Sequence, residues 1–522
     1  MRTPWVRRAF FLTTVLAVCL PLPTAGQPPP PVTAAVVTEK VQAHRRAHAH
    51  EILQELRALV ELPNVAAHAD DIRRNAAHLQ GLLERRRFAT RLLSAEAGAP
   101  AVYAERTTPG ATRTVVFYAH YDGQPVVEAQ WTDPPWQAVL RTGPLAAGGT
   151  PLAWDALPAT LPADARLYGR SSSDDKGPIV AFLAAVDALD AAGIAPSVNL
   201  KVFLEGEEEA GSPHLEALLR AHRDTLRADL WIFGDGPVHQ SRRPLVSFGV
   251  RGTIGLELTV FGPLRPLHSG HYGNWAPNPA AELATLLASM RDDEGRILMA
   301  GFADRVKADA GAESVSATLP DVESALRDEL ALGRTEQVAG RLADSIALPA
   351  MNIRGLDAGS VGDAAANAIP VRARASIDFR LVPDLTPADV RRLVEAHLAG
   401  RGYHVVADEP APELRRTHRR LVHLEWSTGY PGYRMPTTLP LSRAVVRVVA
   451  EAAAAPVVVV PTLGGSLPLY LFADVLGAPV ITVPIVNHDN QQHAADENLR
   501  LQNLWDGIET YAALIARLGT AW

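Results

Sequence analysis

The sequence predicts an α/β fold, in which a main domain on a mostly parallel sheet is interrupted by an inserted α+β domain. Apolar strand-like runs alternate with helical stretches between about residues 40 and 246, which is typical of βαβ units. From about residue 248 the strands alternate apolar and polar residues, as expected for a sheet with one wet face. After about residue 436 the first pattern returns. The 522 residues also exceed what one hydrophobic core usually supports, so two domains are expected.

The apolar spacing predicts the elements of the main domain. Residues between Val41 and Val60 suit an amphipathic helix, residues 76–83 suit a second, and a third follows Asp175 and ends at Gly193. The strands are expected in continuous apolar runs, because a strand buried on both faces lacks alternation. These runs are TVVFYAH, LKVFLEGEEE, DLWIFGDG and PVITVPIVNHDNQQH.

The inserted domain is predicted from alternating strands at 252–260 and 371–379, covered on one side by helices at 280–290 and 388–399. The chain then returns to the first sheet, where residues 441–455 suit a helix and 478–486 a buried strand. The expected organisation is a signal peptide at 1–26, a proline-rich linker at 27–40, the main domain at 41–246 and 436–522, and the inserted domain at 247–435.

The N-terminus has the features of a secretory signal peptide. Three arginines precede the apolar stretch 9–22, and small residues follow at 24–26. The stretch is shorter than the roughly 20 apolar residues of a spanning helix, so no transmembrane segment is expected after cleavage. The protein is therefore expected to be exported, to the periplasm or beyond the cell. A lipoprotein anchor at Cys19 is the minor alternative, because Val18 stands where a small residue is expected.

Composition narrows the possible partners and ligands. The chain is 47% hydrophobic and 20% charged, and its formal net charge of −7 argues against a nucleic-acid partner. Cys19 is the single cysteine, so the mature chain would have neither a disulfide nor a thiolate ligand. Any metal must therefore be bound by histidine and carboxylate side chains.

The four apolar runs share one further feature, because each ends in acidic residues or histidines. The carboxyl ends of parallel strands meet at one edge of a sheet, so these side chains are expected to converge. Carboxylates and imidazoles held close together either shift one another's pKa or share cations. A two-metal centre that activates water is therefore predicted. The candidates are His120, Asp122, Glu208, Glu209, Asp235 and His493, with Asp174 at a helix start.

Each candidate also has a structural interpretation when it is taken alone. A histidine two residues before an aspartate is a weak motif, Asp174 suits a helix cap, and Asp235 suits a turn. The run EGEEE could be a solvated loop, although its carboxylates repel one another without counter-charge. Within it, one glutamate could bind metal while its neighbour serves as general base. The last histidine ligand could be either His488 or His493.

Taken together, eight segments resemble the zinc-dependent metallopeptidase family that contains carnosinases, non-specific dipeptidases, aminoacylases and glutamate carboxypeptidases. The segments occur in the family's order across nearly the whole mature chain, and their combination is highly specific. They are HYDGQP (120–125), LYGRSSSDDKGP (167–178), EGEEEAGS (205–212), GDGP (234–237), LHSGHYGN (267–274), FRLVPD (379–384), GGSLP (464–468) and HAADENL (493–499).

The resemblance implies two divalent metal ions, with Zn²⁺ as the first choice and Co²⁺ or Mn²⁺ as alternatives. Asp174 resembles the carboxylate that bridges both ions, Asp122 the acid that orients a histidine ligand, and Glu208 the general base. Alignment of Glu-Glu-Ala-Gly-Ser orders the two glutamates, and the Asp-Glu that follows His493 favours it over His488. The implied terminal ligands are His120, Glu209, Asp235 and His493.

In this family the inserted domain is a ferredoxin-like lid that also mediates homodimerisation, while the main domain has zinc-peptidase-like topology. The resemblance implies that His268, from the partner subunit, helps to polarise the scissile carbonyl, and that Arg380 and Ser466 hold the substrate carboxylate. Both roles are chemically sensible, because an oxyanion needs a donor and a guanidinium suits a carboxylate. Taken alone, His268 could be a loop histidine and Arg380 a solvated strand residue.

Two departures from the family pattern stand beside the site. Ser171 occupies the place of a second glycine in the turn before Asp174. Thr462 and Leu463 replace the Arg-Glu that precedes Gly-Gly-Ser in carnosinase-like members, which bears on substrate selection.

The predicted function is hydrolysis of an amide bond next to a free carboxylate, in dipeptides or short peptides, by a metal-activated water. An N-acyl-amino-acid deacylase that uses the same centre is the alternative. A non-catalytic binding protein of the same fold is a third hypothesis, which the presence of every ligand and of the base argues against.

Overall fold

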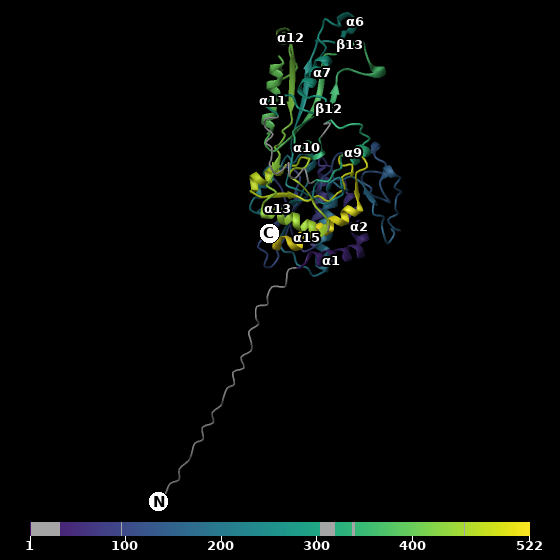
Figure 1. Ribbon diagram of the computed structural model, residues 1–522, viewed down its shortest axis with the longest axis vertical. Helices are drawn as coiled ribbons and strands as arrows, with labels where there is room; N and C mark the ends of the chain where they lie inside the picture. The colour runs from purple at the N-terminus through teal and green to yellow at the C-terminus, as the bar shows by residue number, and fades with distance from the viewer. Residues whose placement is uncertain (2–31, 96, 303–318, 337–339, 454) are drawn as a thin grey trace.

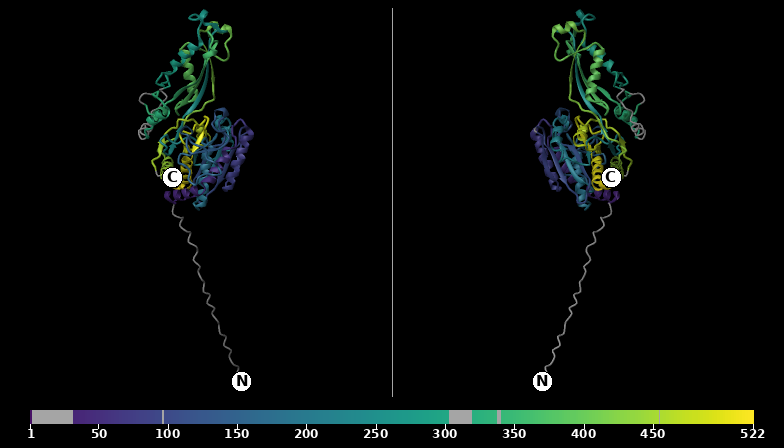
Figure 2. Two further views of the ribbon diagram at one scale, coloured as in Figure 1. Left: turned by 90° about the vertical axis from the view of Figure 1, so that its right-hand side faces the viewer. Right: turned by 90° about the vertical axis from the view of Figure 1, so that its left-hand side faces the viewer.

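The computed structural model describes residues 1, 32–95, 97–302, 319–336, 340–453 and 455–522. Almost all of the expected signal peptide and the first part of the proline-rich linker lie outside the described residues. Figures 1 and 2 show a main domain, which carries the C-terminus, and an elongated inserted domain above it. The chain leaves the main domain at β9 (Gly249–Val250) and returns at β17 (Tyr433–Arg434), and these two strands pair with each other.

The main domain is built on an eight-stranded mixed sheet in the order β1-β2-β6-β3-β7-β19-β8-β18. Its neighbours β6, β3, β7 and β19 are the four apolar runs singled out in the sequence, and each pairs parallel with the next. Antiparallel pairings add β1 and β2 on one side and β8 on the other. The parallel centre brings four strand ends to one edge. The strands are β1 (Ala89–Leu93), β2 (Ala101–Arg106), β3 (Thr114–His120), β6 (Asn199–Glu205), β7 (Leu230–Phe233), β8 (Leu245–Ser247), β18 (Val458–Val460) and β19 (Val480–Thr482).

Helices cover this sheet. Helix α4 is buried along nearly its whole length because it packs against both the sheet and α15, and α1, α13 and α15 lie together at the base of the domain (Figure 1). The single helix expected between residues 41 and 60 is two helices that meet at His48, whose backbone leaves helical geometry. The helices are α1 (Ala34–Ala47), α2 (Ala49–Val60), α3 (Ala69–Arg85), α4 (Lys176–Ala191), α5 (Leu215–Ala221), α13 (Pro440–Ala453), α14 (Leu469–Leu471) and α15 (Leu501–Ala521).

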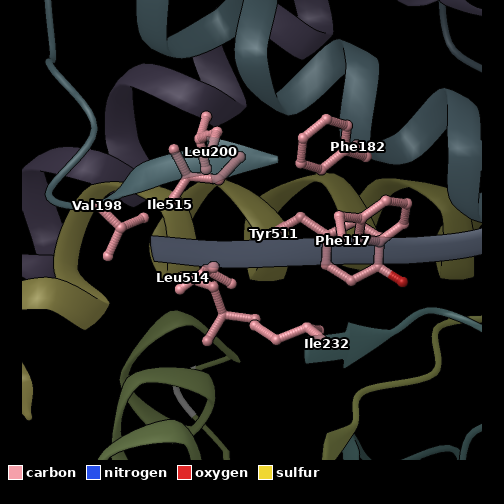
Figure 3. Close-up of a pocket in the computed structure, with 9 residues that line it drawn as sticks. Phe117, Phe182, Val198, Leu200, Ile232, Tyr511, Leu514 and Ile515 are labelled. Carbon is pink, nitrogen blue, oxygen red and sulfur yellow. The ribbon is translucent and has the colours of Figure 1, made fainter. Parts of the chain in front are cut away.

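A small apolar cavity lies in the core between the sheet and these helices (Figure 3). The ring of Phe117 in β3 stacks on Phe182 in α4 with centroids 4.5 Å apart, and Tyr511 in α15 meets Phe117 edge-on. The cavity measures about 20 Å³, which is little more than one water molecule needs. It is a packing defect of the core and not a ligand site.

The inserted domain has a five-stranded sheet in the order β12-β14-β10-β16-β15, which is antiparallel except for β15 and β16. Its strands alternate as expected, since Ile254, Leu256, Leu258 and Val260 are buried in its core. Helices α7 and α11 pack onto this sheet. The elements are β10 (Gly252–Phe261), β12 (Ala350–Asp357), β14 (Arg372–Leu381), β15 (His404–Val406), β16 (Leu421–Trp426), α7 (Pro279–Met290), α11 (Pro387–Gly400) and α12 (Pro412–Thr417).

Shorter elements occupy the two ends of the inserted domain. A ribbon of β11 (Leu267–His268) and β13 (Ala368–Ile369), with α6 (Ser269–Tyr272), forms the tip remote from the main domain (Figure 1). Helices α9 (Glu323–Glu329) and α10 (Leu342–Ile346) lie at the border with the main domain.

A small three-stranded sheet completes the main domain, with β5 (Arg166–Tyr168) between β4 (Val139–Arg141) and β20 (Asn498–Arg500). Among the helices that the structure describes, none combines the length and the apolar character needed to span a membrane.

Candidate metal centre

The loops at the carboxyl edge of the parallel strands bring the predicted ligands together. His120 ends β3, Glu209 lies in the turn after β6, Asp235 follows β7, and His493 lies in the loop after β19. Two groups of ligand atoms result, and within each group the atoms lie within 4.8 Å of one another. Asp174, just before α4, belongs to both. The groups are His120, Asp174 and Asp235, and Asp174, Glu209 and His493.

The two oxygens of Asp174 face different groups. Oδ1 lies 2.9 Å from Nε2 of His120, whereas Oδ2 lies 3.0 Å from Nε2 of His493. Nε2 of His493 is also 3.2 Å from Oε2 of Glu209, and Oδ2 of Asp235 is 3.9 Å from His120. A carboxylate shared in this way suits a bridge between two cations. The donors are nitrogen and oxygen alone, which fits divalent ions such as Zn²⁺, Co²⁺ or Mn²⁺.

Several carboxyl groups are buried close together at this cluster. Burial, reinforced by repulsion from Asp174, raises the pKa of Asp235 to about 7 and raises the pKa of Glu209. Burial also opposes ionisation of Asp174, but hydrogen bonds from His120 and His493 hold the pKa of that carboxyl well below its usual range. Carboxylates that raise one another's pKa are stabilised in the ionised form by a cation between them. The electrostatics of the cluster therefore favour bound metal.

Asp122 is placed to orient both a ligand and the turn after β6. Its Oδ1 lies 3.4 Å from Nδ1 of His120, on the side of the ring opposite the cluster. The same carboxylate accepts the backbone N–H groups of Glu208 and Glu209 at 3.1 and 3.0 Å. One buried aspartate thus fixes a histidine and the two adjacent glutamates, and the second contact could not be predicted from sequence.

Glu208 lies beside the cluster and lines a large cavity that Asp174 and Asp235 also line. Its Oε2 is 4.0 Å from Nε2 of His120, and it belongs to neither ligand group. Burial raises its pKa well above the usual range. A carboxylate in this position is suited to accept a proton from a water activated nearby.

Glu497 is an additional residue of the site, which sequence reasoning used only for alignment. It is fully buried, and each polar group around it is a donor. Its Oε1 accepts the N–H groups of Ser173 and Asp174 and the hydroxyl of Ser173 at 2.8–3.0 Å. Its Oε2 accepts the N–H of Ser171 at 2.9 Å and pairs with Arg170 at 2.7 Å. Glu497 therefore ties the loop of His493 to the loop that presents Asp174.

Ser171 adopts the conformation for which glycine is usual. Its φ of 63° lies in the left-handed region, where a side chain is strained. Its Oγ accepts a hydrogen bond from the Asn64 amide at 3.0 Å, and the same amide donates to the carbonyl of Tyr121 at 2.7 Å. The hydroxyl of Ser171 thus takes part in a buried hydrogen bond with Asn64, which a glycine at this position could not form.

Two glutamines also contact the ligand carboxylates. Gln492 donates to Oδ2 of Asp174 at 2.7 Å, and Gln124 donates to Oε2 of Glu209 at 2.8 Å. His488, the other candidate histidine, lies instead 3.7 Å from Glu329 of α9. The structure therefore brings His493, and not His488, into the cluster.

The predicted substrate-binding residues line the same cavity, which has a volume of about 870 Å³. Nη1 of Arg380 donates to Oγ of Ser466 at 2.9 Å, and its Nε pairs with Asp378 at 2.9 Å. Arg251 donates to the carbonyl of Gly464 at 2.9 Å and so braces the loop that carries Ser466. Burial, followed by repulsion from Arg380, lowers the pKa of Arg251 to about 10. Arg251 is a second cation at this end of the cavity that sequence reasoning missed.

His268 does not reach the cluster within one chain. It is exposed in β11. This strand pairs with β13, which lies at the tip of the inserted domain remote from the main domain (Figure 1). The ring of His268 lies beside that of His271, with centroids 4.4 Å apart. Within a single subunit the cavity therefore holds the predicted ligands, base and carboxylate-binding pair, but not this histidine.

Known proteins share this architecture and about a quarter of the aligned residues. The model of peptidase family M20/M25/M40 matches residues 116–517. The Cys-Gly metallodipeptidase dug1 of Schizosaccharomyces pombe is 25% identical over 435 residues, which cover 81% of this chain and 83% of the relative. The Beta-Ala-His dipeptidase of Homo sapiens is 25% identical over an alignment that covers 98% of each chain.

Solved structures of family members have the same fold as this chain. The M20 family metallo-carboxypeptidase Sso-CP2 from Sulfolobus solfataricus superposes with a TM-score of 0.72 at 25% identity, over 90% of this chain and 99% of that one. Human carnosine dipeptidase 1 has the same fold, with a TM-score of 0.72 at 22% identity over 92% and 100% of the two chains. Because the family match spans most of the sequence, the chain belongs to peptidase family M20/M25/M40 and is a metallopeptidase.

Proposed function

We propose that the protein is an exported dipeptidase with two metal ions, which hydrolyses the amide bond next to a free carboxylate in dipeptides or short peptides. The observation that carries the proposal is the single cavity lined by Asp174, Glu208, Arg380 and Ser466. It places a metal-binding cluster and a carboxylate-binding pair within reach of one small substrate. The relatives named Cys-Gly metallodipeptidase and Beta-Ala-His dipeptidase support a dipeptide as that substrate.

Each residue has a defined task in this proposal. Two divalent ions, Zn²⁺ in the first place, would polarise the scissile carbonyl and lower the pKa of the attacking water. Glu208 accepts the proton of that water and delivers it to the leaving amine. Arg380 and Ser466 hold the substrate carboxylate, and Asp122 keeps the imidazole of His120 in the required orientation.

The proposal includes a homodimer formed through the inserted domain, in which His268 of one protomer completes the site of its partner. The position of His268 at the remote tip supports this arrangement, because a donor to the scissile carbonyl is needed near the metals. Export rests on the arginines, the apolar stretch and the small residues of the first 26 positions.

A competition assay tests the reaction. Purified mature protein is stripped with a chelator, re-loaded with Zn²⁺, Co²⁺ or Mn²⁺, and given a mixed panel of dipeptides, longer peptides and N-acetyl-amino acids, with products identified by mass spectrometry. Preferential cleavage of the dipeptides and short peptides is the expected result. Preferential release of acetate would establish the deacylase instead, and release of single residues from long peptides a carboxypeptidase.

A further inference from the structure

Beyond the metal cluster, the cavity has a wall of apolar side chains. The loop after β18 contributes Leu463 and Leu467, and the main sheet contributes Leu245. The inserted domain supplies the facing part, with Leu319 and Ile346. The cavity is therefore much larger, and its lining much less polar, than the binding of two ions and one carboxylate requires.

The two halves of this wall are in direct contact. Leu319 packs with Leu245 and with Val458 and Val460 of β18. Helix α10 lies over the Gly-Gly-Ser loop, because a methyl group placed on Gly464 would meet Cδ1 of Ile346 at 3.4 Å. Gly464 is two residues from Ser466, so the apolar wall adjoins the carboxylate-binding pair.

Most charged groups of this region form hydrogen bonds or ion pairs within the protein. Arg341 donates to the carbonyls of Leu319 and Pro320 at 2.9 Å and lies 3.7 Å from Glu323. Burial and repulsion from Arg243 lower the pKa of His239 to about 4, so this lining residue is neutral at pH 7. Asp344 and Arg434 add one charge of each sign to the lining. The wall offers no excess of either charge to a substrate.

We propose that this wall binds the side chain of the substrate's carboxyl-terminal residue and that the enzyme prefers a large apolar residue there. The inference rests on the proposed dipeptidase function. A substrate whose carboxylate lies on Arg380 and Ser466 and whose scissile carbonyl lies at the metals has its carboxyl-terminal side chain between them, next to Leu463 and Ile346. A glycine in that position, as in Cys-Gly, would leave the wall uncovered.

The preference is measured as kcat/KM of the Zn²⁺-loaded enzyme for Ala-Leu, Ala-Phe, Ala-Asp and Ala-Gly. Ala-Leu and Ala-Phe are expected to exceed Ala-Gly by about tenfold or more, since even one methylene in an apolar pocket is worth about 10- to 200-fold. Equal values for Ala-Leu and Ala-Gly would overturn the inference alone. Absence of hydrolysis of all four peptides would overturn the proposed function and the inference with it.

A substitution at Ile346 tests whether the apolar wall causes the preference for a large apolar carboxyl-terminal residue. Ile346 is only partly buried in a short helix, so Ile346→Asp is expected to fold, and an unchanged Tm checks this. The variant should lose about tenfold or more of kcat/KM for Ala-Leu while keeping that for Ala-Gly. Leu92→Asp is the matched control, because Leu92 is 45% exposed on β1 and does not line the cavity. An equal loss for both peptides in Ile346→Asp would contradict the assignment.

Discussion

At the residue scale, three consecutive glutamates after β6 have three different surroundings. Glu207 lies 2.9 Å from Nδ1 of His214, outside the cavity. Glu209 faces His493 at 3.2 Å and belongs to a ligand group. Glu208 lines the cavity without joining either group. We therefore expect Glu207, Glu208 and Glu209 to act as a structural carboxylate, a proton acceptor and a metal ligand, respectively.

Substitution of Glu208 by Gln tests this division of labour. The amide cannot accept the proton of water, so kcat is expected to fall by about 100- to 10,000-fold, the usual contribution of general acid–base catalysis. Metal content, measured by mass spectrometry of the purified protein, should stay at the wild-type value. Glu207→Gln is the matched control and should keep kcat. Loss of metal together with activity in Glu208→Gln would instead make Glu208 a ligand.

Substitution of Glu497 by Gln tests how the site is held in place. An amide presents N–H groups where the two oxygens of Glu497 now meet donors only, so the loop that presents Asp174 should loosen. Metal affinity, measured by competition with a chelator, is expected to fall by about 10- to 100-fold, the usual effect of losing a supporting group behind the ligands. Glu451→Gln, at a glutamate that pairs with Arg517 on the surface, is the control. Unchanged affinity would show that Glu497 has no influence on the metal centre.

The convergence of the candidate ligands could be predicted from sequence, because His120 ends one buried strand and Asp235 lies just after another, and the ends of these strands must meet. Glu497 and Gln492 could not. Their contacts with the Asp174 region join loops more than 300 residues apart, and no local pattern reports such a pairing. Ser171 was correctly singled out, but the Asn64 partner that favours a serine there is visible only in three dimensions.

At the element scale, an ion pair anchors the loop between β19 and β20. Arg166 of β5 donates to Oδ2 of Asp489 at 2.5 Å and to the Asp489 carbonyl at 3.2 Å. Burial opposes ionisation of Asp489, but Arg166 and Asn487 lower its pKa to about 2, from an ordinary value of 3.8. The pair fastens the loop four residues before His493.

The pH dependence of stability follows from this lowered pKa. An acid whose pKa is depressed by folding contributes stability above its unfolded pKa, and the contribution is lost as the pH falls through the folded value. Asp489→Asn should therefore lower Tm between about pH 5 and 7, with a difference from wild type that narrows below about pH 4. Differential scanning calorimetry from neutral pH downward measures it. A difference that widens toward acid would contradict the role of the ion pair.

Long elements were easier to predict than short ones. The alternating strands β10 and β14 and the helices α7 and α11 are confirmed, because each has enough residues to show its period. The break at His48 was missed because apolar positions continue across it. Strands β9 and β17 are each only two residues long, which is too short for a periodic pattern to appear in the sequence.

At the scale of the whole molecule, activity is expected to depend on a second protomer, because the proposed homodimer brings His268 of one protomer to the site of its partner. A mixture of two inactive variants tests this dependence. If His268→Ala and Glu208→Gln chains are unfolded and refolded together in equal amounts, half of the dimers are mixed, and each mixed dimer contains one complete site. About a quarter of the wild-type activity is then expected.

The same variants refolded separately and then combined at once are the control for this experiment, and they should remain inactive until the protomers exchange. An inactive co-refolded mixture would show that His268 serves the site of its own chain. Full activity of His268→Ala alone would remove this histidine from the reaction.

The domain arrangement was predicted because the change of strand pattern near residue 248 is abrupt. The contact of α9 and α10 with the main domain was not predicted. Leu319 packs on strand residues that lie more than 100 positions later in the chain, and neither partner carries a local signal of the other. It is this unpredicted contact that gives the cavity its apolar wall.

A metal titration tests whether hydrolysis needs two metal ions. Turnover of Ala-Leu by the chelator-stripped protein is measured while Zn²⁺ is added stepwise. Negligible turnover is expected without metal, and a plateau is expected at two equivalents per chain, because Asp174 belongs to two ligand groups. Turnover by the stripped protein equal to that of the loaded protein, or no turnover at any zinc concentration, would contradict this expectation.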